Sequence, residues 1–315
     1  MEIGLILMFF IIGLIMTVKG GDLFVDASIW IAERTGISSG IIGATVVSMA
    51  TTLPEFFVST VASNEGFSEM AVGNAIGSYI CNIAFIIGVC SLIKPIEIKS
   101  SFFGIKGVMM ISFLSIFFIL AKDGIITFRE GYLLMLLIIF FIAINIFEHK
   151  KVDIHRNKRK RKPIKKKELI KNGFKFVIGV LLIVYGAHIL VDSGVKIANI
   201  LRIPKQVVSL TLLAVGTSIP EFVTSLVAIF KNQQNISIGN ILGANILNIS
   251  IVIGASTLVS DRGLIVTGQT LFTDIPMAMV VSLIFIVIGL LKERIGRFTG
   301  LVLLGTYIGY LIILF

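Results

Sequence analysis

The sequence contains little charge and little cysteine. Asp, Glu, Lys and Arg make up only 15% of the 315 residues, 56% are hydrophobic, and the mean hydropathy is +1.00. This excludes an ordinary water-soluble protein, because the core of a soluble domain cannot bury so much apolar side chain. The two cysteines, Cys81 and Cys90, are nine residues apart on one predicted helix. They point to opposite faces of that helix, which excludes a disulfide bond between them.

Long apolar runs take the place of the missing charge. Ten of them reach the roughly 17 residues that a helix needs to cross a bilayer. They cover residues 3–30, 40–63, 71–93, 102–121, 126–147, 173–198, 206–230, 236–259, 270–291 and 298–314. The sequence therefore predicts an all-α integral membrane protein with ten transmembrane helices. The first run has no basic leader and no cleavage site of small residues, so we expect a retained helix rather than a signal peptide.

The positive charge is concentrated in one segment. Residues 148–175 contain 13 Lys or Arg and 3 Asp or Glu, whereas the rest of the chain has 15 of each sign. Loops rich in Lys and Arg stay in the cytoplasm. We therefore expect a cytoplasmic linker at 148–172, free or resting on anionic lipid, and both termini outside a prokaryotic plasma membrane. Nothing in the sequence indicates a nucleic-acid partner, and the oligomeric state cannot be read from it.

The chain contains an internal repeat. Shifting the sequence by 166 residues aligns 18–88 with 184–254 without a gap, and 23 of the 71 aligned positions are identical. Each half has five predicted helices, and an odd number reverses the second copy across the membrane. We therefore expect two inverted five-helix repeats, 1–147 and 173–315, separated by the linker. Such repeats are typical of secondary transporters, whose binding site lies at mid-membrane between the repeats.

Two related motifs, "TTLPEFF" and "TSIPEFV", place a proline and a glutamate inside apolar stretches. Pro54 and Pro220 lack the N–H that would bond the carbonyl four residues back, which frees backbone oxygens. The next residues are the carboxylates Glu55 and Glu221. Hydroxyl groups stand beside them, at Thr51, Thr52, Thr217 and Ser218. One such proline can be a simple kink, but two inverted copies without a nearby basic residue favour an all-oxygen site for a hard cation such as Ca²⁺ or Na⁺.

A second pair of motifs follows in the next helix of each half, "GNAIGSYICN" at 73–82 and "GNILGANILN" at 239–248. Each has two glycines four residues apart, which lets helix backbones approach closely. The polar side chains recur at steps of four or eight, on one helix face, at Asn74, Ser78 and Asn82 and at Asn240 and Asn248. The alternative for the two earlier asparagines is that they are interhelical hydrogen-bonding groups. The two later ones are predicted as cation ligands or as hydrogen-bond partners of the glutamates.

The sequence resembles the sodium/calcium exchanger family of cation/calcium antiporters over all ten predicted helices. The resemblance is carried by "ATTLPEFFVS" with "GNAIGSYICN" and by "GTSIPEFVTS" with "GNILGANILN". It implies a ten-helix inverted-repeat fold in which helices two, three, seven and eight surround four cation sites. It further implies that Ca²⁺ binds the carboxylates of Glu55 and Glu221 and the carbonyls of Thr51 and Thr217. The implied sodium ligands share these groups and add Ser78, Ser218, Thr52, Asn82, Asn248 and the carbonyls of Ser48 and Ala214.

The sequence departs from the family pattern at a few positions. Ala50 and Thr52 replace the usual Gly and Ser, but Thr52 keeps its hydroxyl. Asn248 stands where prokaryotic members commonly have Asp, and other exchangers have Asn there. Ala244 replaces a serine that would bind one sodium ion, so one implied sodium site lacks an oxygen. The coupling ion and the stoichiometry therefore stay open.

The two buried glutamates predict obligatory exchange. Two bare carboxylates at mid-membrane are costly, so the empty carrier should rarely reorient, and one Ca²⁺ or several Na⁺ would neutralise them. We expect a Na⁺-driven Ca²⁺ antiporter that extrudes calcium, has no resident cofactor and is not an enzyme. Use of H⁺, or transport of another divalent ion, is the open alternative within the same fold.

Two other classes fit less well. An intramembrane metalloenzyme would need a histidine motif, and the three histidines, His149, His155 and His188, lie away from the proline-glutamate motifs. A cation channel built from the same oxygens would not require exchange. Asp274, followed by Pro276, has no counterpart in the repeat and no predicted role.

Overall fold

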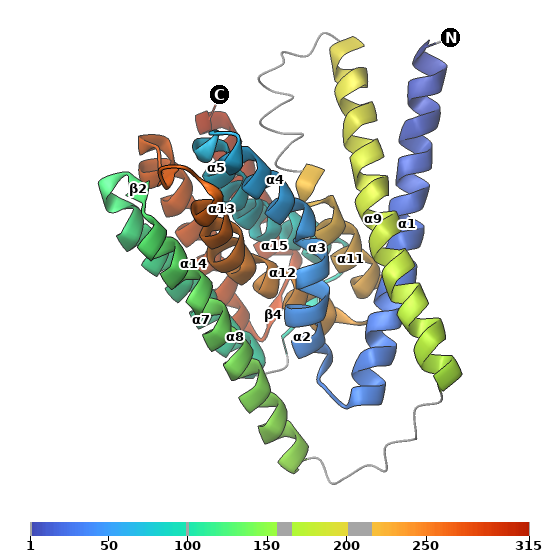
Figure 1. Ribbon diagram of the computed structural model, residues 1–315. Coiled ribbons are helices and arrows are strands. Elements are labelled where there is room, and N and C mark those ends of the chain that lie inside the picture. The colour runs from blue at the N-terminus through green and yellow to red at the C-terminus, as the bar shows by residue number, and fades with distance from the viewer. Residues whose placement is uncertain (1, 99–100, 156–165, 201–215, 315) are drawn as a thin grey trace.

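The computed structural model describes residues 2–98, 101–155, 166–200 and 216–314 (Figure 1). The first half contains α1 (Glu2–Thr35), α2 (Ser39–Ile42), η1 (Gly43–Val47), α3 (Ser48–Thr51), α4 (Leu53–Asn64), α5 (Ser68–Ile80), η2 (Cys81–Ile87), α6 (Gly88–Ile93), β1 (Ile96–Glu97), α7 (Ser101–Leu120), η3 (Ala121–Asp123), β2 (Ile125–Ile126) and α8 (Phe128–His155). The second contains α9 (Lys166–Ile200), α11 (Ile219–Phe230), α12 (Gln234–Leu247), η4 (Asn248–Val252), α13 (Ile253–Val259), β3 (Leu264–Ile265), η5 (Thr270–Asp274), α14 (Ile275–Lys292), β4 (Arg294–Ile295) and α15 (Arg297–Leu314).

The described chain is almost entirely helical, as the apolar runs predict. Eight of its helices are long and apolar enough to cross a membrane, or nine if the bent pair Ser39–Thr51 and Leu53–Asn64 is one span. The shorter apolar helix α11 covers the end of the expected span 206–230, whose beginning lies outside the described residues. The chain is therefore a multi-pass helical membrane protein.

The helices that flank the expected linker are longer than the sequence indicates. The apolar runs end at 147 and resume at 173, but α8 continues to His155 and α9 begins at Lys166. Both helices thus extend into the basic segment. Charged helical turns of this kind suit a membrane surface, where water and lipid headgroups solvate the side chains.

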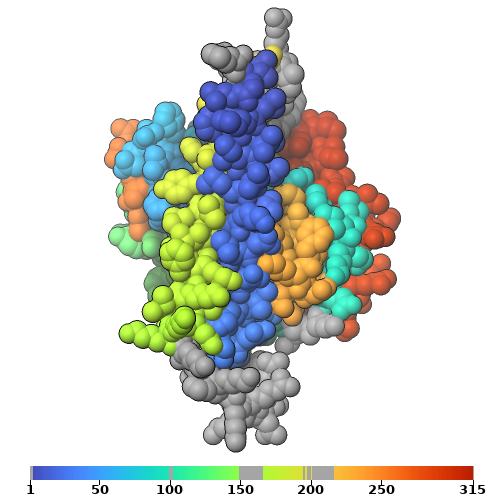
Figure 2. Space-filling view, turned by 90° about the vertical axis from the view of Figure 1, so that its right-hand side faces the viewer, coloured from blue at the N-terminus to red at the C-terminus, as the bar shows by residue number. Residues whose placement is uncertain are grey.

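Helices α1 and α9 form a long pair on one side of the molecule (Figure 1). Small residues let their backbones approach: a Cβ atom on Gly20 would lie 2.8 Å from the carbonyl oxygen of Gly179, and one on Gly186 would lie 2.5 Å from Thr17 Oγ1. Figure 2 shows α1 between α9 and α11. Lys231, directly after α11, joins this pair to the rest of the fold, because its Nζ lies 2.6 Å from Asp26 Oδ1.

The centre of the molecule is formed by α5 with η2 and by α12 with η4. Within an apolar stretch of 18 residues, 72% of the residues are buried in the span Ser68–Ile93 and 94% in the span Gln234–Val259. Both spans change from α-helix to π-helix near the last asparagine of the second motif. The π-helix η2 begins at Cys81, next to Asn82, and the π-helix η4 begins at Asn248 itself. π-Bulges are frequently found at functional sites.

Short strands connect the two halves at both ends of α7. β1 pairs with β4 in antiparallel register, so that Ile96 faces Ile295, and β2 pairs with β3, so that Ile126 faces Leu264. Each ladder thus joins a loop of the first half to a loop of the second. The four central isoleucine and leucine side chains of these pairs are fully buried. The halves are therefore interlocked, and their interface passes through the centre of the bundle.

Candidate cation-binding site

Both proline-glutamate motifs interrupt a helix. The chain bends by 44° between α3 and α4, where Thr52 is the one non-helical residue before the helix that contains Pro54. In the second half Ser218 forms a turn immediately before α11. Glu55 and Glu221 consequently lie in the first turn of a new helix. The positive end of a helix dipole stabilises a carboxylate in this position.

The two carboxylates are fully buried and are bonded across the interface between the halves. Ser218 Oγ donates to Glu55 Oε1 at 3.4 Å, and Thr52 Oγ1 donates to Glu221 Oε1 at 3.2 Å. The second oxygen of each carboxylate, Oε2, has no hydrogen-bond partner among the described residues. A buried charge with an unpartnered oxygen is costly unless a cation or proton compensates it.

Hydroxyl and amide groups form a second set of bonds between the halves. Thr51 Oγ1 donates to Asn240 Oδ1 at 3.1 Å, and Thr217 Oγ1 donates to Asn74 Oδ1 at 3.3 Å. Ser78 Oγ also lies 3.3 Å from Thr217 Oγ1. Asn74 and Asn240, the two earlier asparagines of the second motif, thus form hydrogen bonds between helices, which is the alternative role considered for them from the sequence. They hold the hydroxyl groups of the site in place.

The two later asparagines are both buried, but their surroundings differ. Asn82 Nδ2 donates to Asn245 Oδ1 at 2.9 Å, which leaves Asn82 Oδ1 without a partner in the described part of the chain. Neither polar atom of Asn248 has a partner there. Asn245 is a residue of the site that the sequence analysis missed. It lies within the quoted motif, but outside the steps of four that mark the other polar positions.

Three further positions named from the sequence are Ser48, Ala214 and Ala244. The Ser48 carbonyl accepts hydrogen bonds from the Thr52 N–H at 2.9 Å and from Thr51 Oγ1 at 3.4 Å. Ala244 is fully buried on α12 and brings no side-chain oxygen. Ala214 lies outside the described residues. Hydrogen bonds therefore bring the two glutamates and the hydroxyl groups beside them together with Asn74, Ser78 and Asn240. Asn82 is bonded to Asn245 instead, and Asn248 has no partner among the described residues.

The donor set consists of hard oxygen ligands. Two carboxylates, several hydroxyls and two amides converge from α3, α4, α5, α11 and α12, and within the described ranges no three His, Cys, Asp or Glu side chains come together. Oxygen ligands with two negative charges suit Ca²⁺, and hydroxyl and amide oxygens suit Na⁺ as well. The arrangement can bind hard cations and neutralise them inside an apolar bundle.

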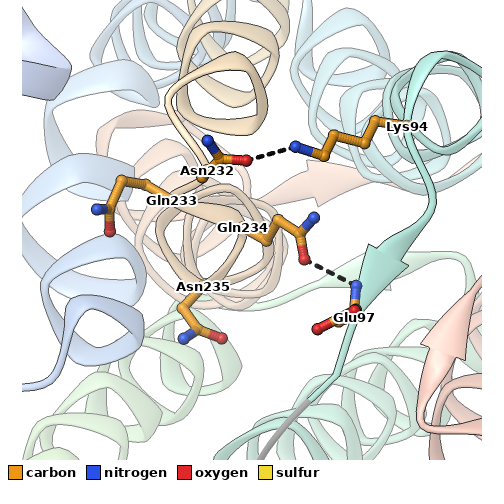
Figure 3. A pocket seen from close by; sticks show the side chains of 6 residues that line it. All are labelled: Lys94, Glu97, Asn232, Gln233, Gln234 and Asn235. Carbon is orange, nitrogen blue, oxygen red and sulfur yellow. Dashed lines mark hydrogen bonds between the residues drawn. The ribbon is translucent and has the colours of Figure 1, made fainter.

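A buried aspartate and a surface pocket are separate from this candidate site. Asp274 is buried in η5 and accepts a hydrogen bond from Tyr310 Oη at 3.0 Å. A surface pocket of about 410 Å³ is lined by amide side chains and by Lys94 and Glu97 (Figure 3). There Gln234 Oε1 accepts a hydrogen bond from the Glu97 N–H at 2.9 Å. None of the predicted ion ligands lines this pocket.

Comparison with known proteins gives a consistent picture. The family model "Sodium/calcium exchanger protein" matches residues 5–147 and 173–315. The sodium/calcium exchanger MaX1 of Methanosarcina acetivorans is 29% identical over 97% of each chain, and the inner membrane protein YrbG of Escherichia coli is 31% identical over 97% of this chain and 95% of its own. A solved structure of the sodium-calcium exchanger NCX_Mj, soaked without Na⁺ and Ca²⁺, superposes with a TM-score of 0.86 at 28% identity, covering 99% of this chain and 100% of its own.

Proposed function

The chain belongs to the sodium/calcium exchanger family, and from this premise we propose that it is an antiporter that extrudes Ca²⁺ from the cell in exchange for Na⁺. The observation that carries the proposal is the pair of buried carboxylates, Glu55 and Glu221, each bonded to a hydroxyl of the opposite half. A cation bound between them would contact both halves at once. Its binding and release would therefore be linked to their relative position.

In this proposal Ca²⁺ is held by the Glu55 and Glu221 carboxylates and by the carbonyls of Thr51 and Thr217. Na⁺ uses the same groups, so that the two ions compete, and its further ligands or supporting groups are Ser48, Thr52, Ser78, Asn82, Ala214, Ser218 and Asn248. The unpartnered Oε2 atoms of both glutamates and Oδ1 of Asn82 support this assignment, since each is a buried acceptor that a cation would satisfy. Both ions are cargo, and the proposal requires neither a resident cofactor nor a catalytic step.

Exchange follows from the cost of the bare carboxylates. Each ionised glutamate at mid-membrane costs at least ~2.5 kcal/mol, so the empty site opposes reorientation by ~5 kcal/mol. One Ca²⁺ or several Na⁺ remove most of this cost. The loaded carrier reorients, and the empty carrier does so rarely, which makes transport an obligatory exchange.

We further propose that the chain crosses the plasma membrane ten times, as inverted repeats 1–147 and 173–315. The segment 148–172 is cytoplasmic and both termini are outside. The sequence repeat and the hydrogen bonds between equivalent groups of the two halves support this topology: Thr52 bonds Glu221 as Ser218 bonds Glu55. Trypsin should cut the basic linker in inverted membrane vesicles, which expose the cytoplasmic side, and leave it intact in right-side-out vesicles. Cleavage from the outside alone would contradict this orientation.

The functional test is ⁴⁵Ca²⁺ uptake into proteoliposomes that contain the purified protein and internal Na⁺. We expect uptake to require internal Na⁺ rather than choline and to be lost in Glu55→Gln and in Glu221→Gln. Glu69→Gln is the matched control, since Glu69 is an exposed acid at the start of α5. Uptake that persists in both glutamine variants would contradict the proposal.

A second candidate keeps the same fold but couples Ca²⁺ or another divalent ion to H⁺. It is favoured by Ala244, which is fully buried. Because alanine replaces a serine there, one implied sodium position lacks a side-chain oxygen. Protons could neutralise the two glutamates as Na⁺ does. A pH gradient imposed without Na⁺ distinguishes the candidates: uptake under this condition supports H⁺ coupling, and its absence supports Na⁺.

A further inference from the structure

Asn245 is a fully buried amide in the middle of α12, and its orientation is fixed by its neighbours. Its Nδ2 donates to the backbone carbonyl of Tyr79 at 3.2 Å and lies 3.7 Å from Met110 Sδ. A carbonyl oxygen and a thioether sulfur can only accept hydrogen bonds. The NH₂ end of Asn245 must therefore face α5 and α7, and its Oδ1 must face the other way.

The fixed amide of Asn245 in turn orients Asn82. Asn245 Oδ1 accepts the hydrogen bond from Asn82 Nδ2 at 2.9 Å. An acceptor at this place requires the NH₂ end of Asn82, so the carbonyl end of Asn82 must point away from Asn245. That atom, Asn82 Oδ1, is buried and has no partner among the described residues. Orientation matters here, because only the oxygen end of an amide attracts a cation, whereas the NH₂ end repels it.

The described residues of the second half provide no equivalent arrangement. The 166-residue shift aligns Asn245 with Tyr79 and Asn248 with Asn82. The Tyr79 hydroxyl forms a hydrogen bond with Ser282 Oγ at 2.9 Å. Both polar atoms of Asn248 remain without a partner in the described chain. The two asparagines related by the repeat are therefore unequal. Asn82 is held with its oxygen turned away from Asn245, and Asn248 has no such hydrogen bond to any described residue.

We propose that Asn245 is a positioning residue that holds the carbonyl oxygen of Asn82 ready for Na⁺, whereas Asn248, the repeat equivalent of Asn82, has no such partner among the described residues. The proposal rests on the proposed function, because it takes the oxygens around Glu55 and Glu221 as the ion site. Asn245 itself does not touch the ion.

The test is Na⁺ binding to the purified protein, measured by calorimetry, in Asn245→Leu. Leucine has nearly the same size but no polar atom, so Asn82 loses its fixed acceptor and its amide can turn. We expect the Na⁺ affinity of the protein to fall about 5-fold or more, in line with the loss of one orienting hydrogen bond. Asn145→Leu is the matched control, because Asn145 is another buried amide, and its Nδ2 donates to Phe141 O within α8.

A double substitution separates orientation from packing. In Asn82→Asp both ends of the side chain are oxygens, so its orientation no longer matters. Adding Asn245→Leu to Asn82→Asp should then leave Na⁺ affinity unchanged or increase it, since Asn245 Oδ1 would otherwise face a carboxylate oxygen. An equal loss in both backgrounds would mean that Asn245 is only a packing residue and would overturn the proposal. A folded Asn245→Leu that binds Na⁺ as the wild type does would also overturn it.

The same titration distinguishes this inference from the proposed function. If the wild-type protein binds no Na⁺, the sodium-coupled function itself fails. If the wild type binds Na⁺ and Asn245→Leu binds it equally well, the function stands and the positioning role fails. Size-exclusion profiles of all variants show whether a loss of binding is a loss of fold.

Discussion

Two glycines that are equivalent in the repeat are predicted to respond oppositely to the same substitution. Gly73 and Gly239 open the second motif of each half, and the 166-residue shift aligns them. A Cβ atom on Gly239 would lie 2.3 Å from the carbonyl oxygen of Gly40 and 2.9 Å from the Ala44 nitrogen. A Cβ atom on Gly73 would meet no described atom within 4 Å. Gly239→Ala should therefore be destabilising and Gly73→Ala should be tolerated.

The size of the difference follows from the contact distance. The clash at Gly239 is with backbone atoms that cannot rotate away, and an ordinary contact begins at 3.4 Å, so α12 must move by about 1 Å. Overpacking of this kind costs ~1–3 kcal/mol. Alanine in a helix interior gains ~0.5–1 kcal/mol over glycine, and Gly73→Ala receives this gain without the clash. Gly239→Ala receives the same gain, so the two variants should differ in unfolding free energy by the cost of the clash, ~1–3 kcal/mol.

The assay is thermal unfolding of the detergent-purified variants, followed by ⁴⁵Ca²⁺ uptake. We expect the Tm of Gly239→Ala to fall by several degrees and that of Gly73→Ala to stay level or rise. Transport should fall in Gly239→Ala too, because the neighbouring Asn240 bonds Thr51 across the interface at 3.1 Å. Equal Tm values for the two variants, or a larger loss in Gly73→Ala, would refute the close packing of α12 on α2 and η1.

Two further predictions concern single side chains. Lys106 is fully buried and its Nζ lies 2.9 Å from Glu148 Oε2, so Lys106→Met should leave a largely buried carboxylate unpaired and lower stability by ~3 kcal/mol. The pair Lys106→Met with Glu148→Gln should restore most of the lost Tm, and a double variant no more stable than the single one would show that the ion pair is not the cause. Ala244→Ser adds a hydroxyl at a fully buried position, and we expect half-maximal uptake at an internal Na⁺ concentration about 5-fold lower. An unchanged Na⁺ dependence in folded protein would place Ala244 away from the sodium position.

The local geometry of the two proline-glutamate motifs could be predicted from the sequence because it is set by local patterns. A proline followed by a glutamate inside an apolar run indicates a broken helix with a buried acid, and the structure places both acids in the first turn after a break. Steps of four put Asn74 on one face with Ser78 and Asn82. The repeat then indicates that the two acids approach each other from opposite halves. The hydrogen bonds from Ser218 and Thr52 agree with this arrangement.

The partners of each side chain could not be predicted, because they depend on which helices touch. Asn245 falls outside the regular polar steps, and its role is visible only when Tyr79 O and Asn82 are both in place. The repeat likewise hides the inequality of Gly73 and Gly239, since identical residues pack against different neighbours. The ends of α8 and α9 were also missed. Hydropathy detects the lipid-embedded part of a helix, and a charged continuation into water carries no such signal.

The most direct test of the account is the position of bound Ca²⁺. Crystals grown with Ca²⁺ and measured for anomalous scattering should show one peak in contact with Oε2 of both Glu55 and Glu221, at the roughly 2.3–2.6 Å typical of calcium ligands. This result would establish that the paired carboxylates of the two halves form the calcium site. A calcium peak elsewhere in the protein, with none between these carboxylates, would contradict the account.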